Sequence, residues 1–382
     1  MAVIIAKICT CTRLQSPFFV SLLYNINIEH TVNKCCRLWP HQNIFVNLHI
    51  MDKSAPSNLT SVSIKNFKSV KSVTLSDCRR INVLIGRPNV GKSNILEALA
   101  LFDVPYMVNS SNKSLKNLLR IENTADLFHN GVATTLIEVS TGGNTVNVLR
   151  SANNGLSVDI SIQGEVSKYA FSSSLTLSTK KDPAVLPDIL AYFFPKHFVP
   201  ESSNTGFLLP PSGGNLMETV ANLPNLKSGL AELFHGYGLK MMFDSGSQQI
   251  KAMRENGLDM FLVPFSSLAD SLQRLIFYKA AIESNRNKVL CFEEPEAHTF
   301  PPYISNVVND IITGDSNQFF ITTHSPYVMS SLLESAGNDL AVYVVDMKDN
   351  ATIVNRLTDN QLQEAYDNGM DMFYNLEAYL GK

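Results

Sequence analysis

The segment from residue 81 to residue 101 constrains the fold of this chain more than any other part of the sequence. Residues 81–85 form an apolar run of strand length, residues 86–93 form a glycine-containing loop, and residues 94–101 are mostly good helix formers. A continuous apolar strand is typical of a parallel strand that is buried on both faces of its sheet. The order of strand, loop and helix therefore predicts an α/β domain built on a parallel sheet.

The loop at residues 86–93 matches the phosphate-binding pattern G-x-x-x-x-G-K-S in full. Its two glycines permit a tight turn whose backbone N–H groups point at a phosphate, and the following helix adds the positive end of its dipole. Lys92 can reach the β- and γ-phosphates, and the hydroxyl of Ser93 can ligate Mg²⁺. We therefore predict ATP and Mg²⁺ as cofactors. The predicted ATP-binding residues are Gly86, Arg87, Pro88, Asn89, Val90, Gly91, Lys92, Ser93 and Asn94.

Three polar side chains follow two further apolar strands. Glu293 and Glu294 come directly after residues 289–292, and His324 comes after residues 318–323. The carboxyl ends of the strands in an open α/β sheet face the ligand crevice. We predict that Glu293 and Ser93 hold the magnesium ion, and that the catalytic pair is Glu294 and His324. Glu294 would orient the attacking water, and His324 would contact that water or the γ-phosphate.

Each of these groups also has an ordinary structural interpretation. Two glutamates after a strand usually belong to a solvated turn, and a lone histidine at a strand end usually caps that strand. Their common position downstream of a phosphate loop favours the catalytic interpretation.

Four segments of the chain resemble motifs of the RecF/SMC-like ABC ATPases. They are residues 64–69 (Ile-Lys-Asn-Phe-Lys-Ser), the phosphate loop, residues 293–298 (Glu-Glu-Pro-Glu-Ala-His) and residues 321–326 (Ile-Thr-Thr-His-Ser-Pro). Within that class the chain resembles the OLD-like (overcoming lysogenization defect) AAA family ATPases of bacterial defence, including the ATPase subunit of PARIS-type systems. The resemblance implies an ABC-type P-loop fold, with a mixed central sheet in two lobes and an inserted α/β subdomain.

The resemblance also implies a signature loop that contacts the nucleotide of a partner protomer. The candidate signature residues are Ala269, Asp270 and Ser271. Ala269 stands where the family has a serine, and Ser271 stands where the family has a glycine. These departures predict slow hydrolysis. Ser267 with Asp270 also fits an ordinary capping box at a helix start.

Two further departures from the family pattern concern the nucleotide pocket. Glu293 replaces the usual aspartate beside the magnesium ion. No glutamine occupies the expected Q-loop position, for which His129 and Asn130 are a weak substitute after the strand-like residues 125–128.

The composition favours a cytoplasmic protein. The chain is 45% hydrophobic and 17% charged, with a net charge of −3, so a nucleic-acid or anionic-membrane partner is not demanded. Its apolar runs are shorter than the roughly 18 residues of a membrane span. Four of its six cysteines lie within the first 50 residues, and unpaired thiols in a reducing cytosol are the expected state.

We predict two parts in the chain. Residues 1–58 are expected to be a non-native or disordered N-terminal extension, because they lack helical periodicity and strand alternation, and because Met51 opens a polar stretch. Residues 59–382 are expected to form the ATPase domain. Its lobe elements should lie within 59–135 and 265–350, with an inserted region at about 136–264.

Local patterns predict several further elements. Alternation predicts antiparallel strands between residues 133 and 163 and a hairpin at about residues 241–253. Apolar spacing predicts one or two helices within 216–239, a helix over 271–282 and a helix from residue 360 to about residue 380.

The predicted function is an ATP-driven switch. Two protomers would sandwich ATP, and the closed dimer would hold or release a separate effector protein in anti-phage defence. A separate effector is expected because the segment after His324 is too short for the nuclease domain that OLD nucleases carry there. The alternative is a RecF/SMC-like DNA-repair ATPase that clamps DNA, in which case DNA is the partner. No membrane partner is expected.

Overall fold

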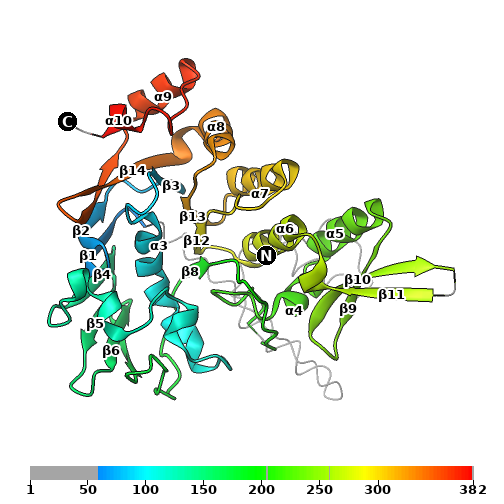
Figure 1. Cartoon of the computed structure of the whole chain (residues 1–382), viewed down its shortest axis with the longest axis horizontal. Helices are drawn as coiled ribbons and strands as arrows, with labels where there is room; N and C mark the ends of the chain where they lie inside the picture. Colours follow the sequence, from blue (N-terminus) through cyan, green and yellow to red (C-terminus); the bar gives the residue numbers. More distant parts are fainter. Residues whose placement is uncertain (1–58, 204, 258, 381–382) are drawn as a thin grey trace, which may run out of the picture. The chain divides into compact units, whose positions relative to one another are not determined.

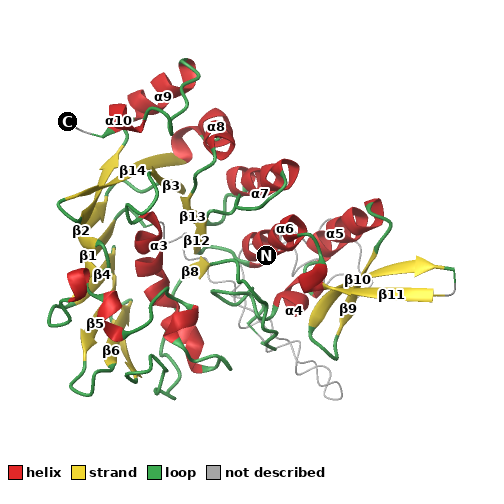
Figure 2. Cartoon of the chain, viewed as in Figure 1, coloured by secondary structure: helices red, strands yellow, loops and turns green. Residues whose placement is uncertain are grey.

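The computed structural model describes residues 59–203, 205–257 and 259–380, which all belong to one unit of the chain. Helices and three sheets make up this part (Figure 1), and Figure 2 distinguishes the two kinds of element. The predicted N-terminal extension, residues 1–58, lies outside the described residues.

The central sheet has six strands in the order β15-β14-β3-β13-β12-β8. The five strands from β14 to β8 run parallel to one another, and β15 pairs antiparallel with β14. The sheet is therefore mixed, as the resemblance implied. Its strands are β3 (Ile81–Gly86), β8 (Ile189–Tyr192), β12 (Val289–Glu293), β13 (Gln318–Thr322), β14 (Leu340–Lys348) and β15 (Ala351–Arg356).

A second sheet is antiparallel throughout, in the order β2-β1-β4-β5-β6-β7. Its strands are β1 (Val62–Phe67), β2 (Val70–Leu75), β4 (Ile137–Thr141), β5 (Asn144–Arg150), β6 (Leu156–Ile162) and β7 (Glu165–Phe171). Every second residue of β6 is buried and the residues between are not, because one face of an antiparallel sheet packs on the core and the other faces water.

The third sheet has three antiparallel strands in the order β11-β10-β9. They are β9 (Lys240–Asp244), β10 (Gln249–Asn256) and β11 (Asp259–Pro264). The predicted hairpin is confirmed as β9 and β10, and β11 adds a strand that the sequence pattern did not predict.

The helices of the described part are α3 (Lys92–Ala100), α4 (Leu216–Ala221), α5 (Pro224–Gly236), α6 (Asp270–Ser284), α7 (Pro301–Thr313), α8 (Pro326–Ser335), α9 (Asp359–Asp367) and α10 (Leu376–Tyr379). They lie around the central and the third sheet: Figure 1 shows α3 on one side of the central sheet, α6, α7 and α8 on the other, and α4 and α5 beside the third sheet. No helix among the described residues is long and apolar enough to cross a membrane.

The central strand β3 is buried on both faces, as its apolar run predicts. Ile81, Val83 and Ile85 belong to a core that includes side chains of α6, α7 and α8. Leu84 belongs to a second core, in which α3 lies between the central sheet and β1. The helix that follows the phosphate loop is thus held between two sheets, which fixes the position of its first residue.

The predicted fold class, an α/β P-loop ATPase with a mixed central sheet, is confirmed by this arrangement together with the comparisons below. The region predicted as an insertion, about 136–264, supplies strands to all three sheets: β4–β7 extend the sheet of β1, and β8 is an edge of the central sheet. The division of the chain into lobes and insertion remains a prediction.

Three local predictions need correction. Residues 125–128, predicted as strand-like, belong mainly to a 3-10 turn over Thr124–Leu127, because Asn123 and Asp126 form a capping box there. The helix predicted from 360 to about 380 is two helices, α9 and α10, with Gly369 at φ 58° between them. The helix near the signature begins at Asp270 with Ala269 as its N-cap, and no side chain caps it, so the predicted capping box is absent.

Asp103 is a charged residue in the core between the two large sheets. It lies in the 3-10 segment Leu101–Val108 and is 1% exposed. Its Oδ2 accepts a hydrogen bond from the backbone N–H of Ala191 in β8 (2.9 Å). Its Oδ1 is buried and has no hydrogen-bond partner in the described part of the chain. Burial raises the pKa of Asp103 well above its usual range, although the Ala191 N–H lowers it.

We predict that Asp103→Asn raises the free energy of unfolding and that the gain grows with pH. Because the folded-state pKa lies above the unfolded value of about 3.9, stability is intact below that pH and falls as the pH rises toward the folded-state pKa. Asparagine keeps an acceptor for Ala191 and carries no charge. Urea unfolding should give little gain at pH 4 and a clear gain at pH 8. Asp315→Asn, at an exposed position, is the control, and a gain for Asp103→Asn that is independent of pH would contradict the prediction.

Candidate functional site

The phosphate loop runs from the end of β3 to the start of α3, and close packing requires both of its glycines. Gly86 has φ 155° and Gly91 has φ 103°. A Cβ on Gly86 would lie 2.2 Å from the carbonyl oxygen of Val345, and a Cβ on Gly91 would lie 2.1 Å from the hydroxyl oxygen of Thr352. The strands β14 and β15 therefore approach the loop so closely that only glycine fits at either position.

Lys92 is the first residue of α3, and its ammonium group folds back over the loop. Its Nζ donates to the carbonyl oxygens of Gly86 (3.0 Å) and Arg87 (2.8 Å). Burial lowers the pKa of Lys92 to about 8, while the carboxylates of Glu294 and Glu293 raise it. The acids that act on this pKa come from the end of β12, so the loop and the acid pair share one electrostatic environment.

The acid pair is held by the neighbouring strand β13. Glu293 lies opposite Thr322 in the parallel register. The backbone N–H of Glu294 donates to the carbonyl oxygen of Thr322 (3.0 Å) and lies 3.2 Å from its hydroxyl. Glu294 has φ 41°, a left-handed conformation that costs about 1–3 kcal/mol for a residue other than glycine. The strand end thus turns the side chain of Glu294 away from the regular strand direction.

His324 lies beside Glu294, with 3.5 Å between its Nε2 and the Oε1 of Glu294. Burial and the nearby Lys92 lower the pKa of His324 below its usual value, while Glu294 raises it. The imidazole is therefore mainly neutral at pH 7, and one of its ring nitrogens is free to accept a hydrogen bond.

One cavity of about 900 Å³ joins these groups. The predicted site residues that line it are Pro88, Asn89, Gly91, Lys92, Ser93, Asn94, Glu293, Glu294 and His324. Three of the predicted ATP-binding residues do not line it: Gly86 is in the strand end, Val90 is buried, and Arg87 forms an ion pair with Glu377 (2.7 Å). Three segments far apart in the sequence thus meet at one cavity.

Among the charged residues that line the cavity and were not predicted from the sequence, three form a connected cluster. Glu97, on the buried face of α3, is 2% exposed and pairs with the ammonium group of Lys68. Its Oε1 also lies 3.1 Å from the Nε of Arg120. Arg120 in turn pairs with Glu293 through NH2. The one sign of this cluster in the sequence was Glu97, a charged residue among the apolar positions of the helix.

The donor set in the cavity fits a magnesium ion that is bound together with a nucleotide. Ser93 supplies a hydroxyl and Glu293 a carboxylate to the same cavity. Mg²⁺ usually takes one or two protein oxygens and completes its shell with phosphates and water. The described residues contain no group of three or more His, Cys, Asp or Glu side chains that could hold a metal ion without such help.

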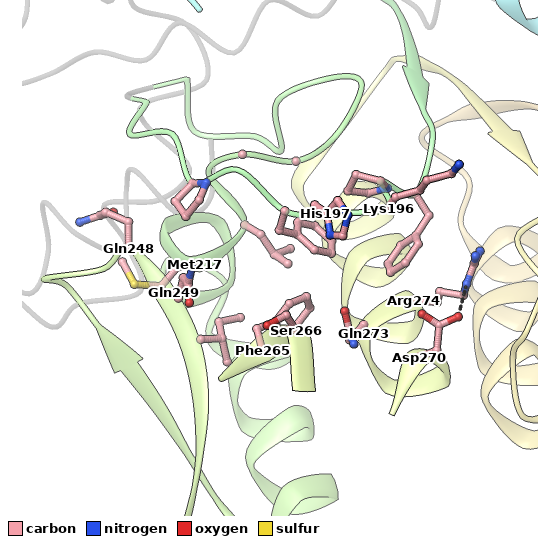
Figure 3. Close-up of a pocket in the computed structure, with 18 residues that line it drawn as sticks. Lys196, His197, Met217, Gln248, Gln249, Phe265, Ser266, Asp270, Gln273 and Arg274 are labelled. Carbon is pink, nitrogen blue, oxygen red and sulfur yellow. Dashed lines mark hydrogen bonds and ion pairs between the residues drawn. The ribbon is translucent and has the colours of Figure 1, made fainter. Parts of the chain in front are cut away.

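The predicted signature residues lie away from this cavity. Asp270 pairs with Arg274 one turn along α6 (3.3 Å), as Figure 3 shows. Asp270 lines a different cavity of about 610 Å³, next to Gln273 and Arg274. Ser271 donates to the carbonyl oxygen of His298 (3.1 Å) and accepts from the N–H of Phe300 (3.1 Å). Arg274 lines both cavities, and the predicted contact of Ala269, Asp270 and Ser271 with a partner's nucleotide remains a prediction.

The weak Q-loop substitute does not line the nucleotide-sized cavity. The Nδ1 of His129 lies 2.9 Å from the carbonyl oxygen of Lys68, and Asn130 lies 3.2 Å from the other ring nitrogen of His129. These contacts anchor the turn near β1 instead.

We predict that Gly91→Ala destabilises the chain far more than Gly131→Ala. Both glycines have positive φ, but a Cβ at Gly131 would meet no atom within 4 Å. Gly131→Ala should therefore cost only the backbone strain, about 1–2 kcal/mol, whereas Gly91→Ala adds about 1–3 kcal/mol for the displacement of Thr352. Urea unfolding measures both values. Equal losses would mean that the packing of β15 against the loop is not a constraint.

Comparisons with known proteins find matches to parts of this chain. Residues 58–169 match a family described as the AAA ATPase domain. A segment of 63 residues is 40% identical to an "ATP/GTP phosphatase" of Helicobacter pylori, which is 16% of this chain and 16% of that protein. A segment of 44 residues is 43% identical to "Uncharacterized protein MJECL10" of Methanocaldococcus jannaschii, which is 12% of this chain and 20% of that protein. The matches thus span at most a fifth of the length of these two relatives.

Two solved structures are similar in a broader sense. One is the Smc head domain of Pyrococcus furiosus with an extended coiled coil, bound to the C-terminal domain of ScpA. It has a TM-score of 0.45 and 13% identity, and the match covers 81% of this chain and 98% of that one. The other is the SMC head domain from Thermotoga maritima, with a TM-score of 0.36, 13% identity and coverage of 79% and 99%.

The family match covers the phosphate loop, α3 and the strands on either side of them. The resemblance to OLD-like and PARIS-type ATPases remains a prediction. Over residues 58–169 the chain is similar to the AAA ATPase domain family.

Proposed function

We propose that this chain binds ATP with Mg²⁺ and hydrolyses it to ADP and phosphate. The observation that carries the proposal is the convergence of Lys92, Ser93, Glu293, Glu294 and His324 on one cavity. This set has a group for each task in phosphoryl transfer, which depends mainly on positioning and charge stabilisation. The name of the Helicobacter pylori relative, an ATP/GTP phosphatase, supports the same reaction class.

The triphosphate would lie against the loop at the start of α3. Backbone N–H groups of the loop and the positive end of the α3 dipole favour anionic oxygens there. Lys92 would exchange its two carbonyl partners, Gly86 and Arg87, for phosphate oxygens. That exchange replaces neutral acceptors with charged ones, which form stronger hydrogen bonds with an ammonium group.

Ser93 and Glu293 would hold the magnesium ion, which supplies neutralising charge on the β- and γ-phosphates when it is bound. Glu293 now pairs with Arg120, so the carboxylate must be shared with that guanidinium or released from it. Arg120 stays attached to the buried Glu97 through its Nε. The Nη2 atom of Arg120 would then be free to turn toward the phosphates, while the Nε atom keeps the side chain attached to Glu97.

Glu294 would orient and polarise the attacking water. A water molecule that hydrogen-bonds both Glu294 and His324 would be held between the two side chains, whose Oε1 and Nε2 atoms are 3.5 Å apart. The neutral state of the imidazole suits this role, because a neutral ring can accept a hydrogen bond from the water at one nitrogen. Glu294 is the proposed general base and His324 the proposed orienting group.

The wider role that we propose is a nucleotide-driven switch in the cytoplasm. Two protomers would close on ATP, each offering residues at the start of α6 to the nucleotide of the other, and the closed dimer would act on a separate effector in anti-phage defence. The resemblance to OLD-like ATPases supports this role. A γ-phosphate that contacts both protomers holds the dimer closed, and its release after hydrolysis opens it.

We predict that Lys92→Ala abolishes ATP binding, whereas Lys71→Ala, at an exposed position of β2, leaves binding unchanged. Lys92 is the cation that the loop offers to the phosphates, and its loss removes charge-assisted hydrogen bonds. Titration with a fluorescent ATP analogue measures both dissociation constants. Equal affinities for the two variants would contradict the placement of the triphosphate at the loop.

We predict that Glu294→Gln binds ATP but hydrolyses it about 100-fold or more slowly, because the amide cannot accept the proton of the water. With saturating ATP and Mg²⁺ this variant should elute from gel filtration as a dimer, and Glu165→Gln, at an exposed position of β7, should behave as wild type. An unchanged monomer would count against the switch. A salt-sensitive DNA mobility shift that strengthens with ATP would instead favour the DNA-clamping alternative.

A further inference from the structure

Glu296 lies two residues after the acid pair, in the turn between β12 and α7, and its side chain points into the protein. Its Oε1 accepts two hydrogen bonds from the turn that follows β13: one from the hydroxyl of Thr323 (2.8 Å) and one from the backbone N–H of His324 (2.8 Å). The hydroxyl of Thr323 also accepts from the backbone N–H of Ser325 (3.0 Å). One carboxylate oxygen thus organises three consecutive residues at the end of β13.

The other oxygen of Glu296 makes the arrangement costly. Oε2 is buried and has no hydrogen-bond partner among the described residues, and an unpaired buried acceptor costs about 1–3 kcal/mol. Burial also raises the pKa of Glu296, against the His324 N–H and the Thr323 hydroxyl, which lower it. Buried polar atoms in folded proteins normally have hydrogen-bond partners. An exception is expected where a residue serves a functional site rather than the stability of the fold.

The imidazole of His324 has few contacts of its own. Its Nε2 is 3.5 Å from Glu294, and its ring centroid is 6.4 Å from that of Phe373. Because neither contact is a close hydrogen bond, the place of the ring depends on where the His324 backbone lies, and Glu296 holds that backbone through its N–H. In return, Thr322 at the end of β13 accepts from the backbone N–H of Glu294 after β12. Each strand end therefore holds the other: a side chain after β12 binds the backbone after β13, and a side chain of β13 binds the backbone after β12.

We propose that Glu296 is a positioning residue for hydrolysis, which keeps the His324 ring beside Glu294 by anchoring the turn after β13. The inference rests on the proposed ATPase function. Glu296 does not line the cavity, so it acts on the water only through His324. A displacement of about 1 Å in a catalytic group can reduce the rate about 100-fold, which sets the scale of the expected effect.

Glu296→Ala and Glu296→Gln separate this role from general stability. Glutamine can keep an oxygen at the position of Oε1, where it accepts from Thr323 and His324, whereas alanine leaves both donors unpaired. We expect kcat for ATP to fall about 10- to 100-fold in Glu296→Ala, with KM and the ATP dissociation constant unchanged. Glu296→Gln should recover most of that loss. Should Glu296→Ala fold poorly, Thr323→Val removes one of the two donors and should lower kcat in the same way.

The double variant Glu296→Ala with His324→Ala tests whether the effect passes through the histidine. If it does, the double variant has the kcat of His324→Ala alone, because the two changes remove the same contribution. Losses that multiply would overturn the inference. A full kcat in Glu296→Ala, or a loss that appears in ATP binding instead of kcat, would overturn it as well.

Amide hydrogen exchange decides the inference without any need for turnover. The His324 amide should exchange faster in Glu296→Ala than in wild type and should stay protected in Glu296→Gln, while amides of β9 and β10 keep their rates in both. If wild type does not hydrolyse ATP, the proposed function fails, yet loss of protection at His324 would still support the anchor. Unchanged protection in Glu296→Ala would overturn the anchor even in an active ATPase.

Discussion

Main-chain hydrogen bonds hold β12, β13 and β3 side by side and parallel, with Glu293 opposite Thr322 and Thr322 opposite Leu84. The carboxyl ends of the three strands consequently lie at one edge of the sheet. The loop with Lys92 continues from β3, the acid pair from β12 and the turn with His324 from β13. The site depends on this register, because a shift of one residue along any of these strands would turn its side chains to the opposite face.

The helix after the loop adds the second constraint. α3 lies between the central sheet and the antiparallel sheet, and its apolar side chains belong to the core that the two sheets share. Because both sides of the helix are packed, its N-terminus cannot move away from the loop without opening a core. The loop itself is closed in by β14 and β15, which approach Gly86 and Gly91 within a distance that no Cβ could occupy. The geometry of the loop is therefore fixed by the packing of the protein itself.

These charged groups around the cavity have hydrogen-bond or ion-pair partners within the protein. Lys92 donates to loop carbonyls, Arg120 pairs with Glu293, and Lys68 pairs with the buried Glu97. A triphosphate with its magnesium ion would offer Lys92 charged oxygens in place of neutral carbonyl oxygens, and charge-assisted hydrogen bonds are the stronger ones. Binding would thus exchange internal contacts for contacts to the ligand. The buried Glu97 would keep Lys68 and Arg120 attached to α3 throughout that exchange.

The local chemistry was readable from the amino-acid sequence: the loop pattern at 86–93, the acid pair, the histidine and the buried strands that precede them. Each of these signals is contained in a few consecutive residues, and each reflects backbone propensity or an apolar run, so no distant contact is needed to read it. The strands of the antiparallel sheet were also visible, because alternation between buried and exposed positions follows from the pleat of a strand. Boundaries such as the break between α9 and α10 were not visible, since a single glycine in a helical pattern does not say whether the helix continues.

The folded chain alone shows which distant residues meet. Arg120 and Glu97 lie outside every motif, Lys68 lies in the segment 64–69 without being predicted as a site residue, and the three meet because α3 packs against β1. The two hydrogen bonds from Thr323 and His324 to Glu296 join positions 27 and 28 residues apart, and sequence spacing contains no information on such a contact. Strand pairing joins parts of the region at 136–264 to the antiparallel sheet of β1 and to the central sheet. Pairing partners are chosen by the burial of whole faces, which is a property of the folded chain and not of any one segment.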